Sequence, residues 1–213
     1  MSDDRSVGAD DGGAGADWPV DLRGVTEAVV TTLGPNDRWN VAALGLHAGD
    51  PITAKTYGRT RTWRNFREHG EGYVQFTTDP VDYAEAALSI REEADPVLDS
   101  ADAWVRVAAE RRDAADDHGT RVVTWALEPI ESALERERVP TINRGHAAVV
   151  EATVAASRLD VDAFDSDRLL DRLAYCADVI GTCGGERERA ALERIETLVD
   201  AEWAVGEDRD GSG

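Results

Sequence analysis

The sequence is short of cations, cysteines and long apolar runs. Of its 213 residues, 43 are acidic and 23 are basic, and Lys55 is the only lysine. Cys176 and Cys183 are too few for a disulfide framework, and their spacing matches no zinc site. No apolar run reaches the ~18 residues of a membrane span, and the start of the chain lacks the apolar core of a signal peptide. The sequence therefore predicts a cytoplasmic protein without a metal site or a membrane span.

The formal net charge of -20 admits two interpretations. Nucleic-acid mimics and disordered acidic tails carry their acids in blocks and have few apolar residues. Here 42% of the residues are hydrophobic, and the acids are scattered through every segment. This pattern favours a folded protein with a carboxylate-rich surface, which is typical of proteins that work in molar salt. The shortage of cations also argues against a nucleic-acid partner, because such binding neutralises phosphates with basic residues.

The first part of the chain reads mainly as strands. We expect a disordered acidic leader at 1–17, a polar segment at 58–62, and a helix from Trp63 to His69 capped by Thr62. Asp79-Pro80 predicts the start of a second helix, which runs to about residue 90. A loose acidic stretch is expected at 111–119. The predicted strands are 26–33, 39–47, 52–57, 73–77, 104–110, 120–128 and, with a helix as the alternative, the first half of 147–157.

The end of the chain has helical periodicity instead. Leu169, Leu173, Cys176 and Ile180 fall on one face of a predicted helix, and a second apolar series follows the glycines at 181–185. The two series predict a helical hairpin, followed by a disordered tail at 206–213. The fold class is therefore mainly β (β+α), with a β-rich body of six or seven strands and a C-terminal helical hairpin.

Two segments are candidates for ligand binding. Arg59, Thr60, Arg61, Thr62 and Asn65 gather two guanidinium groups and two hydroxyls at a helix start, where backbone N–H groups favour an anion such as phosphate. The alternative is a capped helix with two solvated arginines.

The second candidate is the strand Asn40-Val41-Ala42-Ala43-Leu44-Gly45. Its small side chains let a flat ring approach the backbone closely. Ordinary tight packing is the alternative.

These motifs, in their order along the chain, resemble those of the flavin-reductase-like split β-barrel proteins, and more narrowly of the archaeal DUF447 branch. The likeness covers roughly residues 27–158, including a later Asn-Arg-Gly run that begins at Asn143. It implies a split barrel over 18–160, a helical subdomain over 161–205 and FMN as cofactor. The resemblance further implies that the binding residues are Asn40, Ala42, Ala43 and Gly45 at the ring, Arg59, Thr60, Arg61, Thr62 and Asn65 at the phosphate, and Asn143 and Arg144.

The resemblance also implies a homodimer and an oxidoreductase of unknown substrate. A non-catalytic FMN-binding protein and an interaction protein with an empty barrel are the alternatives. The residues show no convincing catalytic group, and His146 and Tyr57 are only candidate proton donors. The chain departs from the family pattern in two places: Ala43-Leu44-Gly45 stands where family members often have Pro-Ile-Gly, and Thr60-Arg61-Thr62 stands where they often have Ser-x-Thr.

Overall fold

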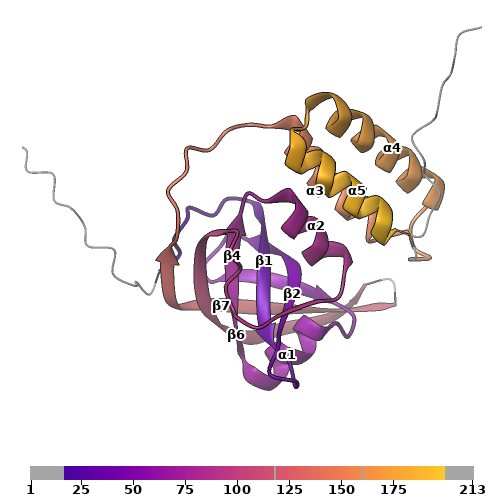
Figure 1. The fold of residues 1–213 in the computed structure, drawn as a ribbon. Coiled ribbons are helices and arrows are strands. Elements are labelled where there is room, and N and C mark those ends of the chain that lie inside the picture. Colours follow the sequence, from indigo (N-terminus) through magenta and orange to yellow (C-terminus); the bar gives the residue numbers. More distant parts are fainter. Residues whose placement is uncertain (1–16, 118, 160, 200–213) are drawn as a thin grey trace, which may run out of the picture.

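A computed structural model describes residues 17–117, 119–159 and 161–199, and it contains a β-barrel with a helical subdomain on one side (Figure 1). The barrel is antiparallel throughout. Its strands are β1 (Val25–Leu33), β2 (Trp39–His47), β3 (Ile52–Tyr57), β4 (Glu71–Thr77), β6 (Ala101–Asp117) and β7 (Thr120–Leu134).

The barrel closes in the order β1-β4-β6-β7-β3-β2, with β1 and β2 paired along their whole length. The short strand β5 (Arg91–Glu93) adds to the outer edge of β2. Alternating positions of the strands point inward, as in Ala101–Ala109, where every second residue is buried. This confirms the split barrel expected from the resemblance.

Helix α1 (Arg61–His69) packs against the barrel through Phe66. Phe66 is 1% exposed, and its ring centroid lies 5.4 Å from that of Trp125 on β7. Gly72 makes room for it, since a Cβ at this position would lie 3.0 Å from the Phe66 ring and 2.9 Å from the Thr31 carbonyl oxygen. Packing of one aromatic side chain therefore fixes where the polar start of α1 lies.

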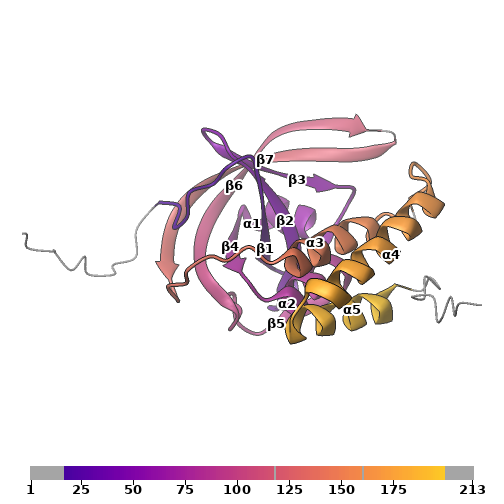
Figure 2. The same cartoon turned by 90° about the horizontal axis from the view of Figure 1, so that it is seen from above.

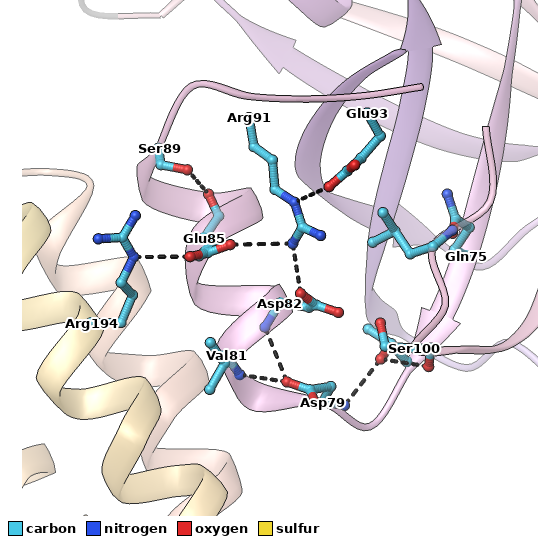
Figure 3. Close-up of polar contacts among 12 residues, drawn as sticks. Gln75, Asp79, Val81, Asp82, Glu85, Ser89, Arg91, Glu93, Ser100 and Arg194 are labelled. Carbon is cyan, nitrogen blue, oxygen red and sulfur yellow. Dashed lines mark hydrogen bonds and ion pairs between the residues drawn. The ribbon is translucent and has the colours of Figure 1, made fainter. Parts of the chain in front are cut away.

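Helix α2 (Pro80–Leu88) joins the barrel to the helical subdomain. Tyr83 packs with strands β1 and β2, whereas Ala84 packs with the C-terminal helices. Its polar face is held by ion pairs, which Figure 3 shows in close-up: Arg91 of β5 donates to Asp82 at 2.6 Å, and Arg194 donates to Glu85 at 2.9 Å. Apolar and ionic contacts thus act on the same short helix.

The helical subdomain consists of α3 (Arg144–Ala156), α4 (Ser166–Cys183) and α5 (Glu186–Leu198), which lie together beside the barrel in Figures 1 and 2. Alanine dominates its core, with Leu173, Ile180 and Ile195 as the large buried side chains. Gly145 permits the closest approach, since a Cβ there would lie 2.5 Å from the Cα of Gly184. Within the described part of the chain, no helix has the length and hydropathy needed to cross a membrane.

The structure corrects several local predictions. Residues 147–157 are not a strand, because they form most of helix α3 and pack with α4, so the helical core begins well before the expected boundary at 160. The stretch 111–117 is not loose, because it continues strand β6. Thr60 rather than Thr62 caps α1.

The leader at 1–16, position 118 and the tail at 206–213 lie outside the described residues. The helix after Asp79 and the C-terminal hairpin are confirmed.

Candidate functional site

The start of α1 presents unused hydrogen-bond donors. The Thr60 hydroxyl accepts the N–H of Trp63 at 3.2 Å, and this cap leaves the backbone N–H groups of Arg61 and Thr62 without a protein acceptor among the described residues. The Thr62 side chain is buried, and its hydroxyl makes no hydrogen bond within the described residues. Orphan N–H groups at a helix start form a natural anion site. The donors present here therefore fit a phosphate group.

Arg61 is not free in solution, because Glu92 of β5 forms an ion pair with it. Glu92 also accepts Asn36 Nδ2 at 2.9 Å, and its backbone carbonyl accepts Arg38. The hydrogen bond from Asn36, followed by the Arg61 charge, lowers the pKa of Glu92, so this carboxylate stays ionised. The result is an arginine whose guanidinium is held beside the helix start by a charge from another element. Sequence reasoning missed Glu92, because nothing local links it to α1.

Asn65 and Asn40 are buried next to that helix start. Asn65 is 1% exposed and donates through Nδ2 to the Thr32 hydroxyl at 3.0 Å. Its Oδ1 has no hydrogen-bond partner in the part of the chain that the structure describes. Asn40 is the cross-strand partner of Thr32. Asn65 therefore ties α1 to strand β1, and this contact gives it a positioning role whether or not it also binds a ligand.

Strand β2 has a gap in its outer hydrogen-bond ladder. β5 pairs with residues 39–41 and β3 pairs only with Leu46 and His47, so no strand in the described part of the chain covers residues 42–45 on this side. The backbone N–H and C=O groups of successive strand residues point to opposite sides of the strand. Two of these four residues therefore point both groups toward the gap. Ala42 packs with the barrel core and Ala43 with the α2 side. The backbone edge, rather than either methyl group, is thus available to a flat ligand.

One further pair lies beside the gap. Glu27 of β1 is opposite Gly45 in the ladder, and a Cβ on Gly45 would lie 3.9 Å from Glu27 Oε2. The same oxygen accepts the Tyr83 hydroxyl at 2.9 Å. Burial, and then the Glu27 charge, raise the pKa of Tyr83 far above its ordinary value, so the phenol stays a donor. This pair could not be predicted from the sequence, because its members are 56 residues apart.

Asn143 and Arg144, which were also predicted to bind the cofactor, lie in the helical subdomain and not at the start of α1. Asn143 caps α3, accepting the N–H of Gly145 at 2.7 Å, and Arg144 begins that helix. Figure 1 shows α1 at the bottom of the barrel and α3 among the helices above it. His146 lies near Glu188 of α5, with 3.9 Å between Nδ1 and Oε1. A role of Asn143 and Arg144 in cofactor binding stays a prediction, and the contacts found for Asn143 and Gly145 are structural.

A polar hollow of about 540 Å³ lies elsewhere, between α2, α5 and the segment after β7. Its arginines already have acidic partners: Arg187 pairs with Asp79, and Arg138 donates to Asp102 at 2.7 Å. It shares no residue with the predicted binding set. We therefore place the candidate site at the gap and the α1 start, not in this hollow.

Models of two protein families match the chain. Residues 26–136 match the N-terminal domain of the DUF447 proteins of unknown function, and residues 143–197 match a second DUF447 model. The chain belongs to the DUF447 family. The boundary between the two matches coincides with the linker between β7 and α3, so the barrel and the helical subdomain of this DUF447 protein correspond to separate family segments.

The chain is similar to several solved structures, one of which shares its fold over most of its length. An FMN-bound DUF447 protein of Methanosarcina mazei superposes with a TM-score of 0.72 at 21% identity, covering 83% of this chain and 96% of that one. The styrene monooxygenase flavin reductase of Pseudomonas putida S12 has a TM-score of 0.36 at 14% identity, covering 55% of this chain and 93% of its own. An FMN-binding protein of Thermus thermophilus gives 0.36 at 14%, with 63% and 82% covered. The first establishes the shared fold of this DUF447 protein.

Proposed function

We propose that this DUF447 protein binds FMN, with the phosphate at the start of α1 and the ring along the uncovered edge of β2. The observation that carries the proposal is the gap at residues 42–45, which adjoins a helix start whose N–H groups lack acceptors. A flat heterocycle has hydrogen-bonding groups on its rim, and a strand edge offers matching ones. The FMN bound by the Methanosarcina relative supports the choice of ligand.

We extend the proposal to an FMN-dependent oxidoreductase. When bound, FMN supplies hydride or electron transfer, and the protein positions it and tunes its electronics. The chain's own contribution would be the anion site at Thr62, the strand edge and the charges around Gly45. A non-catalytic FMN-binding protein remains the alternative function, because the site contains no group that is committed to proton transfer. The homodimer, the cytoplasmic location and the adaptation to salt stay predictions.

The phosphate contact can be tested with a ligand that lacks it. Thr62→Ala is expected to weaken FMN binding by about 1–3 kcal/mol, the scale of a hydrogen bond to a charged group. Riboflavin, which has the same ring and no phosphate, should bind the variant and the wild type equally. The measurement is fluorescence titration of both ligands in molar salt.

The control is Thr53→Ala, on strand β3 away from the helix start. An equal loss for FMN and riboflavin in Thr62→Ala would place the phosphate elsewhere. A wild-type protein that binds neither ligand would refute the proposed function itself. Reduction of the bound flavin by a nicotinamide dinucleotide then separates an oxidoreductase from a carrier.

A further inference from the structure

The only lysine of the chain lies beside the gap. Lys55 is on β3, one residue beyond the last pair that β3 makes with β2, Ala54 with Leu46. Continuing that register by one residue places Lys55 opposite Gly45. Partners across an antiparallel ladder share a face, and Lys55 is exposed where Ala54 is buried. Lys55 and Gly45 therefore share the outer face of the barrel.

Lys55, Gly45 and Glu27 form a row across three strands, from β3 through β2 to β1. Lys55 carries a positive charge, Gly45 has no side chain, and Glu27, its partner in the β1 ladder, carries a negative charge. The two charges do not meet across the glycine. The Glu27 carboxylate instead accepts the Tyr83 hydroxyl, and Lys55 has no ion pair or hydrogen bond within the described residues. The Glu27 carboxylate lies over Gly45, with its oxygens 3.9 and 4.0 Å from a Cβ at that position. Lys55 lies on the opposite side of Gly45, across the gap.

Lys55 belongs to a part of the chain that lacks acids. Elsewhere near the barrel rim several arginines pair with a carboxylate, as Arg61, Arg91 and Arg106 do. Residues 51–67 contain Lys55 and four arginines but no acid. This segment therefore brings positive charge to the β3 side of the gap, whereas Glu27 and Glu92 lie on its other sides. The β3 side favours a ligand that gains negative charge.

Reduction of a flavin adds negative charge to its ring. A nearby cation stabilises that charge and raises the reduction potential, and charge near the ring is one of the levers by which proteins tune the cofactor. An ammonium group is a compact point charge on a flexible stem, unlike the flat guanidinium fork. Lysine can thus place its charge over the row at Gly45.

We propose that Lys55 is the residue that sets the reduction potential of the bound flavin, by stabilising the reduced ring at the edge of β2 beside Gly45. The proposal rests on the proposed function and adds a tuning residue to it. Lys55 acts on the ring through its charge, not by transferring a proton. The hydrogen bond from the neutral Tyr83 hydroxyl does not remove the negative charge of Glu27, so Lys55 acts on the ring against that charge.

The test is a spectroscopic redox titration of the FMN-loaded protein in molar salt. In Lys55→Gln, the affinity for reduced FMN is expected to fall by about tenfold relative to that for oxidised FMN. This ratio corresponds to a potential about 30 mV more negative for a two-electron couple. Lys55→Arg, which keeps the charge, should stay within a third of that shift.

Arg168→Gln is the matched control. It removes one positive charge from α4, at a side chain that is 87% exposed, and should leave the potential unchanged. An unchanged potential in Lys55→Gln overturns the proposal, and so does an equal shift in Arg168→Gln, which would reflect net charge alone. If Lys55→Gln lowers the melting temperature of the flavin-free protein but not the potential, Lys55 is a structural cation and the proposal is wrong. A wild type that binds no FMN would refute the proposed function, and this inference with it.

Discussion

The barrel and the helical subdomain are built on cores of different kinds. Valine, leucine, Phe66 and Trp125 fill the barrel, whereas the helices meet over a row of alanines with a few large side chains such as Leu173. A closed sheet leaves an interior that only bulky side chains fill, while small residues let helices approach closely. The candidate site lies on the barrel and at the start of α1, away from the core of the C-terminal helices. We therefore expect flavin binding to depend on the barrel core and not on the helical core.

The largest expected effect separates the two cores. Phe66→Ala should cost about 3–5 kcal/mol of the free energy of unfolding and should also release the flavin, because Phe66 holds α1 in place. Leu173→Ala should cost about 2–5 kcal/mol while the folded fraction keeps its flavin. Urea unfolding by circular dichroism and flavin retention on gel filtration measure the two properties. Flavin loss from folded Leu173→Ala would show that the helices form part of the site.

An intermediate effect concerns salt, to which both regions should respond together. Lowering the salt from about 1 M to about 0.1 M lengthens the Debye length from roughly 3 Å to 10 Å. Repulsion within a chain of charge -20 then grows, and we expect a lower melting temperature. A salt series of thermal melts, read both by flavin fluorescence and by circular dichroism, follows the two regions. A melting temperature that does not change with salt contradicts the adaptation to salt, and two separate transitions would show that the barrel and the helices unfold independently.

Whether a feature of the fold or the site could be predicted from the sequence depends on how far apart along the chain its residues lie. The cap at Asp79 and the apolar spacing of Leu169, Leu173 and Ile180 are local, and both predicted helices correctly. The strand predicted in the first half of residues 147–157 is a helix, because a run of alanine and valine fits a buried helix as well as a strand. The gap at residues 42–45 could not be predicted, since it depends on where β3 and β5 stop pairing with β2. Motif order, by contrast, pointed to the family correctly.

The smallest effect is expected at the joint between the two regions. Asp79 caps α2 and pairs with Arg187 of α5. Burial acts to raise the pKa of Asp79, but the Arg187 hydrogen bond and the backbone N–H of Asp82 lower it overall. Its contribution to stability is therefore complete above the unfolded value of about 3.9 and is lost as the pH falls through the lower folded value.

Asp79→Ala should cost about 1 kcal/mol, the usual price of a lost cap. Asp79→Asn keeps an oxygen that can cap the helix and loses only the ion pair with Arg187. This variant should therefore lose less stability than Asp79→Ala. Urea unfolding at neutral pH and at a pH below the folded value measures both variants. If the cost of Asp79→Ala is the same at both pH values, the carboxylate charge does not contribute.

The long hairpin of β6 and β7 has a consequence for the behaviour of the protein at high concentration. Beyond Ala109, strand β6 continues past the end of β4, so the backbone of residues 110–116 has no second neighbour in the described chain (Figure 2). An exposed strand edge invites another molecule to add to it. Here every side chain of that stretch except Ala114 and Ala115 is charged, and neither alanine has much tendency to form strands. The hairpin can therefore extend into solvent without becoming a seed for aggregation.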